Sequence, residues 1–210
     1  MTRDASRVEG PHQDHAGEGR RRASIGARRD PDAEAAILEA ARGLLAEKGY
    51  SGFSIDEVAR RAGAGKPTIY RWWPTKTDLF IDVYSAEKSV ALVPPETGAL
   101  WSDLLAYTRA LWTFWRTTPS GRTFRALIAE AQTSEAALAA LRDKFLPERL
   151  KDVRAMFDEA AARGEIRGEA VPHLLALYIG FNWVRLLTDT IADDPQGIET
   201  VARTLAGSPQ

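Results

Sequence analysis

The chain has 210 residues, a length that allows one or two domains and a hydrophobic core without cross-links. It contains no cysteine, which excludes disulfides, thiolate metal sites and a cysteine nucleophile. Its 28 basic and 29 acidic side chains give a net charge of −1, so a globally basic nucleic-acid-binding protein is excluded but a local basic patch is not.

Residues 1–31 form a polar segment with almost no large apolar side chains, and we expect a disordered basic N-terminal arm. Its distal part is basic, with arginines at 20–22 and 28–29. They fit either a solvated tail or an arm that reaches DNA phosphates or the minor groove. The segment lacks the apolar region of a secretory signal, and no uninterrupted apolar run in the chain approaches the ~18 residues of a membrane span. We therefore expect a cytoplasmic protein with no membrane partner.

The first helix is predicted over residues 32–48. A cap and a first-turn proline precede it at Asp30-Pro31, apolar residues recur at helical spacing from Ile37 to Leu45, and Gly49 ends it. Because this stripe covers one face only, the helix is expected to pack on a neighbouring element.

Two short helices follow. Ser54-x-x-Glu57 has the form of a capping box and opens a helix over 55–62, which Gly63-Ala64-Gly65 ends after barely two turns. A third helix is predicted from Pro67 to Trp73, and a second capping box, Thr75-x-x-Asp78, opens a fourth. Two short helices around a glycine turn, supported by a longer one, describe a helix-turn-helix.

The composition of the third helix favours a DNA reader over an ordinary helical corner. It is only about two turns long, yet it carries hydrogen-bond donors and aromatic rings that cannot all face a core. Arg71 is suited to a bidentate contact with guanine, whereas Lys66 and Lys76 are suited to phosphates. For Trp72, packing against a neighbouring helix and contact with the DNA backbone are both open.

Residues 49–79 also carry a set of residues at fixed spacing: Gly49-Tyr50, Ser54-Ile55-x-x-Val58-Ala59-x-x-Ala62-Gly63, Pro67-Thr68-Ile69-Tyr70 and Trp73-Pro74-x-Lys76-x-x-Leu79. Over residues 32–85 this pattern resembles the DNA-binding domain of TetR-type transcriptional regulators. Gly65-Lys66-Pro67 departs from the frequent Ser-x-Gly, and Trp72 and Trp73 stand where His or Tyr and Phe are usual.

The resemblance implies an all-α homodimer. Each subunit would have an N-terminal three-helix helix-turn-helix DNA-binding domain, over 32–85, and a C-terminal helical domain for ligand binding and dimerisation, over 86–210. It implies a double-stranded DNA operator as partner. The residues that match its DNA-contacting positions are Ser54, Lys66, Pro67, Thr68, Tyr70, Arg71, Trp72 and Lys76.

The C-terminal part opens with a predicted helix over 99–117 that is unusually rich in tryptophan. An aromatic stripe of this kind is typical either of a core or of a cavity that holds a flat apolar ligand, and for the helix as a whole we favour the cavity. The predicted lining is Trp101, Leu105, Thr108, Trp112, Trp115, Phe124, Ile128 and Phe145. Arg149 and Glu130 are candidate polar contacts there, although surface ion pairs are the simpler interpretation for both.

Further helices are predicted over 120–131, 134–163 with a kink or break at Pro147, 170–190 and 194–206. The 170–190 helix is apolar almost all round, so one side must be covered by its own subunit and another by a second copy. The predicted dimer interface comprises Tyr178, Phe181, Val184, Arg185, Ile198 and Val201.

Nothing in the sequence favours catalysis. Two of the three histidines, His12 and His15, lie in the N-terminal arm, His173 lies near a helix start, and no phosphate loop or nucleophile motif is present. We therefore predict no enzyme activity, catalytic residue, cofactor or metal. We expect a repressor that a small hydrophobic ligand releases from a pseudo-palindromic operator. A helical partner protein that does not bind DNA, an activator and, more remotely, a helical hydrolase or metal protein are the alternatives.

Overall fold

A computed structural model describes residues 30–191 and 194–207, and every regular element in them is a helix. The first four helices are α1 (Pro31–Lys48), α2 (Ile55–Ala62), α3 (Lys66–Trp72) and α4 (Lys76–Ala91). The remainder are α5 (Leu100–Thr117), α6 (Pro119–Ala131), α7 (Glu135–Ala139), the π-helix η1 (Ala140–Phe145), α8 (Leu146–Arg149), α9 (Lys151–Ala162), the 3₁₀-helix η2 (Gly168–Ala170), α10 (Val171–Leu187) and α11 (Pro195–Leu205). The expectations for the N-terminal arm concern residues outside this description, except that Pro31 already lies in α1.

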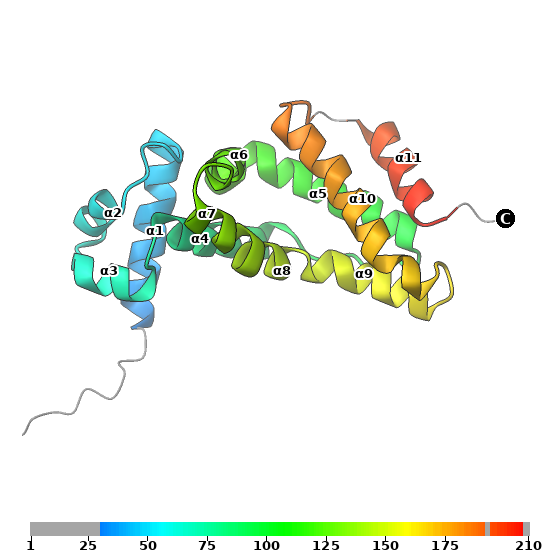
Figure 1. Ribbon diagram of the computed structural model, residues 1–210, viewed down its shortest axis with the longest axis horizontal. Helices are drawn as coiled ribbons and strands as arrows, with labels where there is room; N and C mark the ends of the chain where they lie inside the picture. The colour runs from blue at the N-terminus through cyan, green and yellow to red at the C-terminus, as the bar shows by residue number, and fades with distance from the viewer. Residues whose placement is uncertain (1–29, 192–193, 208–210) are drawn as a thin grey trace, which may run out of the picture.

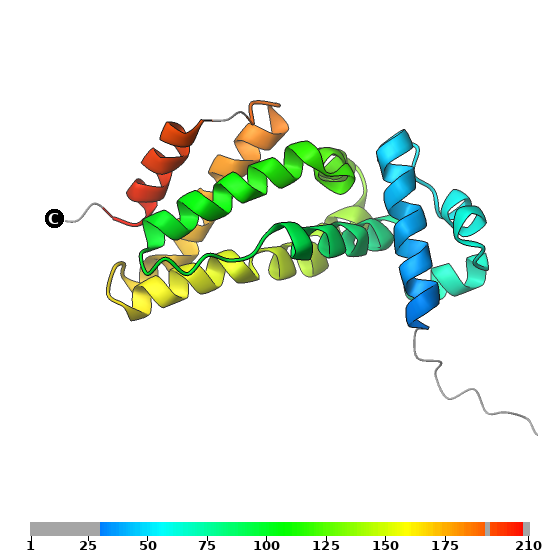
Figure 2. The ribbon, with the colours of Figure 1, turned by 180° about the vertical axis from the view of Figure 1, so that it is seen from behind.

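Two lobes make up the molecule. Helices α1–α3 form a small lobe at one end, and α4 runs from it into a longer lobe built from α5–α11 (Figure 1). From the opposite side, α5 extends along the longer lobe in green, with α9 in yellow on one side and α11 in red on the other (Figure 2). Since α1 packs on α4 and α6 as well as on α2, the two lobes share an interface.

The predicted caps hold the small lobe together, with one exception. The Asp30 and Ser54 side chains accept backbone N–H groups at the starts of α1 and α2, and Thr75 and Asp78 complete the reciprocal capping box of α4. At α2 the box is only half formed, because the Glu57 carboxylate binds the neighbouring arginines in place of the Ser54 backbone.

The helix predicted over 134–163 is four elements in the structure: α7, η1, α8 and α9. Pro147 lies in the first turn of α8 and has no N–H to bond the carbonyl four residues back, and the turn before it takes the wider π geometry. The break places Phe145 and Arg149 on separate short elements that both face the interior of the longer lobe.

Helix α10 ends at Leu187, before the predicted end at residue 190, and Asp189 follows in a left-handed conformation with φ 57°.

The helical segment Gly168–Leu187, which comprises η2 and α10, is long and apolar enough by composition to cross a membrane, with a mean hydropathy of 1.3. Its uninterrupted apolar runs are shorter, which is why the sequence suggested no span. Core helices pass the same test, but only 28% of this segment is buried within the chain, so part of its apolar surface lacks cover.

Candidate DNA-binding surface and ligand cavity

Helix α3 presents one polar face to solvent. Ile69 is fully buried against the small lobe, while Lys66, Pro67, Tyr70 and Arg71 are exposed. The first-turn proline costs no hydrogen bond, so the helix starts cleanly after Gly65. A short helix with a buried anchor and an exposed row of donors has the geometry of a helix that enters the major groove.

Two tryptophans fix α3 on α4. The Trp73 ring is 1% exposed, and its Nε1 donates to Asp82 Oδ2 at 2.7 Å. Trp72 is half-buried with its ring edge-on to Trp73, their centroids 5.7 Å apart. The Arg71 guanidinium lies 5.8 Å from the Trp72 ring centroid. Trp72 therefore packs on the core and supports Arg71, while part of its ring remains accessible.

The remaining predicted DNA-binding residues of the small lobe lie at the start of α2 and on α3 itself. Ser54 is exposed and caps α2, and Thr68 is half-buried on α3. Lys66 reaches back to α2, where its Nζ lies 2.7 Å from Asp56 Oδ2. The structure thus places all the predicted DNA-binding residues except Lys76 at the start of α2 or on α3, and their contact with DNA stays a prediction.

Lys76 lies where the two lobes meet. Its Nζ is 2.9 Å from Glu130 Oε2 on α6 and 4.5 Å from the centroid of the Tyr50 ring. Burial raises the pKa of Tyr50 to about 12, so the ring stays neutral beside the ammonium group. A residue predicted to bind phosphate is therefore held by a carboxylate of the longer lobe, and Glu130 is a lobe-to-lobe contact rather than a cavity residue.

We expect the substitution Glu130→Gln to strengthen operator binding about two- to fivefold, because it removes the carboxylate that competes with a phosphate for Lys76. Fluorescence anisotropy with an operator duplex measures the change. Glu135→Gln, which removes the same charge from an exposed site on α7, serves as control and should leave affinity unchanged. Equal affinity of Glu130→Gln and the parent protein would show that Lys76 has only a structural role.

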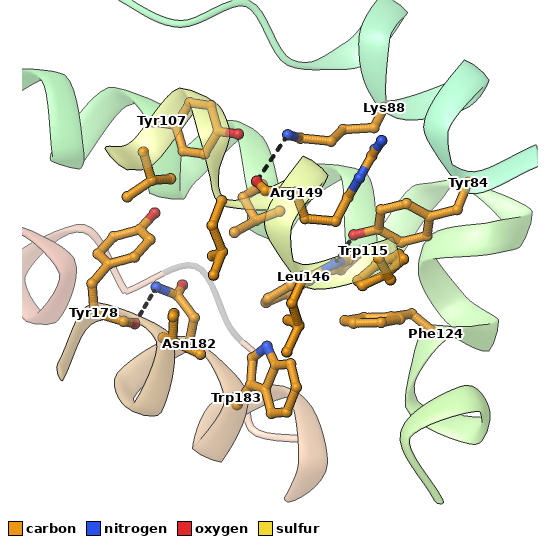
Figure 3. A pocket seen from close by; sticks show the side chains of 15 residues that line it. Tyr84, Lys88, Tyr107, Trp115, Phe124, Leu146, Arg149, Tyr178, Asn182 and Trp183 are labelled. Carbon is orange, nitrogen blue, oxygen red and sulfur yellow. Dashed lines mark hydrogen bonds between the residues drawn. The ribbon is translucent and has the colours of Figure 1, made fainter. Parts of the chain in front are cut away.

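A cavity lies inside the longer lobe, between α4, α5, α6, η1, α8, α9 and α10 (Figure 3). Its volume is about 50 Å³, room for a few water molecules and well below the ~300 Å³ of a typical ligand site. A ligand must therefore displace side chains to enter. The lining residues are Tyr84, Lys88, Tyr107, Leu111, Trp115, Phe124, Phe145, Leu146, Arg149, Leu150, Val153, Tyr178, Ile179, Asn182 and Trp183.

The cavity has a polar end and an aromatic end. Lys88 is 6% exposed, and its Nζ lies 2.8 Å from Asp152 Oδ2, to which the Tyr107 hydroxyl also donates at 3.3 Å. Burial lowers the pKa of Lys88, and the ion pair with Asp152 offsets this only in part. At the other end the Phe124 and Phe145 rings stack with centroids 4.9 Å apart.

The structure places the residues of the predicted ligand site in two groups. Trp115, Phe124 and Phe145 line the cavity, whereas Trp101, Leu105, Thr108, Trp112 and Ile128 do not. The Trp101 ring lies on α11, its centroid 3.7 Å from the Arg203 guanidinium, because Trp101 is in the first turn of α5 and the tryptophans are spread along the helix axis. Trp112 is fully buried and donates from Nε1 to Asn182 at 2.7 Å. These two rings join α5 to α11 and to α10.

Sequence reasoning missed the contributions of α4 and α10 to this cavity. Tyr84 and Lys88 lie on the helix that begins beside α3, and no apolar pattern marks Lys88 as buried. For Arg149 the sequence favours a surface ion pair over a cavity contact, but Arg149 lines the cavity. A basic residue one turn from a buried tyrosine is the signal that could have pointed to Lys88.

An exposed apolar stripe runs along α10. Leu177, Val184 and Leu187 are 62, 61 and 46% exposed, and the exposed Gly180 lies between them on the same face. Their spacing of three or four residues keeps them in line along the helix. We call these four residues the α10 stripe, and they form an uncovered part of α10 within the described chain.

The predicted interface residues divide into two groups. Val184 belongs to the α10 stripe, and Phe181, Arg185 and Val201 are half-buried. Tyr178 is 4% exposed, lines the cavity and pairs its hydroxyl with Thr108 at 3.0 Å. Ile198 is 3% exposed and lies in the core of its own chain. The structure thus buries these two side chains within one chain, and the interface itself stays a prediction.

Two parts of the chain match families of known proteins. Residues 37–83 match the family described as bacterial regulatory proteins, tetR family, and residues 94–205 match the tetracyclin repressor-like C-terminal domain. The chain belongs to the TetR family. It is therefore a DNA-binding transcriptional regulator of the helix-turn-helix type.

Individual relatives agree with this TetR-family membership. The chain is 31% identical over 139 residues to the uncharacterized HTH-type transcriptional regulator YdeS of Bacillus subtilis, covering 66% of this chain and 70% of YdeS. The solved structure of the TetR family transcription regulator SCO0332 is 31% identical, covers 83% of this chain and 97% of its own, and has a TM-score of 0.73. BioQ, solved with its natural double-stranded DNA operator, shares the fold at 16% identity and a TM-score of 0.59, over 82% of this chain and 97% of its own. The prediction of an all-α fold for this TetR-family chain is therefore confirmed.

Proposed function

We propose that the protein is a homodimeric, cytoplasmic repressor, which a small and largely apolar ligand releases from a pseudo-palindromic operator. The observation that carries this proposal is that α4 belongs to both candidate sites. Lys76 begins the helix beside α3, and Tyr84 and Lys88 line the cavity two and three turns later. A ligand that moves the cavity end of α4 therefore also moves the part of the helix that supports α3.

A second contact leads from the cavity to the start of α4. Phe145 lines the cavity, and the preceding Lys144 forms a close ion pair with Asp78 in the capping box of α4. Burial alone would raise the pKa of Asp78, but hydrogen bonds from Lys144 and Thr75 lower it below its usual value, so the pair is ionised at neutral pH. A ligand that displaces Phe145 would pull on this ion pair through η1.

On DNA, the exposed face of α3 would enter the major groove. In this proposal Arg71 and Tyr70 contact base edges, and Thr68 and Trp72 contact the DNA backbone or base edges. Lys66 and Pro67 lie at the leading end of α3. Ser54 and Lys76 bind phosphates. Two such helices related by a two-fold axis would read half-sites about one helical turn apart. That BioQ has the same fold and was solved on its operator supports this mode of binding.

The second subunit would cover the α10 stripe. Three exposed aliphatic side chains and a glycine at helical spacing form a self-complementary apolar surface that a two-fold axis can pair with its own copy. Phe181, Arg185 and Val201 would lie at the edge of that contact. A ligand can shift the two subunits only if it binds one arrangement of the dimer more tightly than the other. We expect a coupling free energy of ~1–3 kcal/mol between ligand and operator binding, which corresponds to a change of about 5- to 150-fold in operator affinity.

Selection of bound duplexes from a random DNA pool at near-physiological salt tests this proposal. We expect enrichment of an inverted repeat, and we expect Arg71→Ala to lose about 10- to 100-fold in affinity for it with relaxed specificity at one base pair of each half-site. A folded dimer that enriches no duplex, even after unfolding and refolding to strip ligand, would favour a partner protein that does not read DNA. A ligand that strengthens operator binding would favour an activator or co-repressed regulator.

A further inference from the structure

Resting on the proposed function, we propose that the cavity binds an amphipathic carboxylate, an aromatic or aliphatic body with one acidic end group that is held by Arg149. The proposal concerns the chemical class of the ligand at this site. It rests on the hydrogen-bonding state of Arg149, on the charges round the cavity and on the neighbouring Tyr84 hydroxyl.

The charge of Arg149 has no anionic partner in the part of the chain that the structure describes. Its Nη2 donates to Ser85 Oγ at 2.8 Å, but its Nε is buried and has no hydrogen-bond partner among the described residues. The guanidinium lies 5.7 Å from the ring centroids of both Tyr84 and Phe145, an apolar setting for a charge. An unpaired N–H on a buried part of a cation costs free energy unless something binds it.

The nearby carboxylates are already committed. Asp152 pairs with Lys88, Asp78 pairs with Lys144 from the other side of η1, and Glu148 pairs with the exposed Lys151. The lining of the cavity therefore includes two cations, Lys88 and Arg149, and no carboxylate, and only Lys88 has an ion pair, with Asp152 outside the lining. A ligand carboxylate would balance this excess, and a guanidinium binds a carboxylate more strongly than any neutral acceptor.

Tyr84 supplies a second donor at the same end of the cavity. Its hydroxyl oxygen accepts from Trp115 Nε1 at 2.8 Å, and its own hydrogen has no acceptor among the described residues. Burial raises the pKa of Tyr84, so the hydroxyl stays protonated and can donate. Figure 3 shows Arg149 beside Tyr84, with Lys88 on the same side. An acid group would thus receive hydrogen bonds from both Arg149 and Tyr84.

The rest of the cavity suits the apolar body of such a ligand. Phe124, Phe145 and Trp183 line it with aromatic rings. Leu146 projects into the space between Arg149 and Trp183 (Figure 3). Leu146 and Arg149 lie on the same four-residue helix, α8, which directly follows the π-turn of η1. Displacing Leu146 would open room beyond the present 50 Å³, while Arg149 at the other end of α8 holds the acid.

Paired probes test the acid requirement directly. Naphthalene-2-carboxylate, 4-phenylbutyrate and decanoate are each compared with the corresponding primary amide by calorimetry and by quenching of tryptophan fluorescence. We expect at least one acid to bind about 10- to 100-fold more tightly than its amide, and Arg149→Met to remove that preference. Arg154→Met, which removes an exposed arginine of α9, is the matched control and should keep it.

Each outcome distinguishes this inference from the proposed function. If amides bind as well as acids, if no acid of the series binds, or if Arg149→Met keeps the preference, the carboxylate assignment is overturned. Operator binding and its release by another class of ligand would still support the proposed repressor. If instead an acid binds through Arg149 but no duplex is bound, the assignment stands and the repressor proposal fails.

Discussion

Val184→Glu should convert the protein into a monomer and weaken operator binding about 10²- to 10⁴-fold. The substitution places a carboxylate in the middle of the α10 stripe, where pairing with its own copy would bury two like charges. Loss of the dimer also removes the gain that comes from binding two half-sites at once. Analytical ultracentrifugation measures the subunit mass, and anisotropy on the same samples measures operator affinity.

A matched variant separates dimer loss from a mere change of charge. Ala106→Glu adds the same group to an exposed position on α5 and should leave both measurements unaltered. Far-ultraviolet circular dichroism should show equal helix content in both variants. A Val184→Glu protein that remains dimeric would show that α10 does not carry the interface through this stripe.

Trp73→Ala should lower the free energy of unfolding by about 3–5 kcal/mol and abolish operator binding. The ring is 1% exposed between α3 and α4, so its removal leaves a large cavity, and Asp82 loses the indole donor. Without this anchor the orientation of α3 depends on Ile69 and on the half-buried Trp72. Urea unfolding followed by circular dichroism gives the stability change.

Trp73→Phe provides the graded comparison. It keeps most of the apolar contact and removes the indole N–H, so we expect a smaller loss of stability and measurable operator binding. Should Trp73→Ala unfold at the same urea concentration as the parent protein, the anchoring role of Trp73 is wrong.

The small lobe was predictable because its signals are local. Caps, breaker residues and first-turn prolines such as Pro31 and Pro67 act within one turn of chain, and α2 matches its predicted range of 55–62. The exception at Ser54 has the same origin. Two arginines follow Glu57 at three and four residues and compete for its carboxylate.

The cavity could not be predicted because its wall is assembled from seven helices. The periodicity of α5 shows which residues face inward, but it does not tell which neighbour each one meets. Trp101 therefore lies against α11 and Trp112 against α10, whereas Trp115 meets Tyr84 of α4. The same limit applies to α10, where equally apolar residues turn either to the cavity, as Tyr178 does, or to solvent, as Val184 does.

The ion pairs of Lys66 and Lys76 bear on how binding responds to ionic strength. Each lysine must leave a carboxylate, Asp56 or Glu130, before it can neutralise a phosphate. The freed carboxylates then bind cations from solution. This uptake offsets part of the cation release from the duplex that accompanies binding. Operator affinity should consequently decline less steeply with added potassium chloride than the number of contacting lysines implies, so that the protein would hold its site over a wider range of ionic strength.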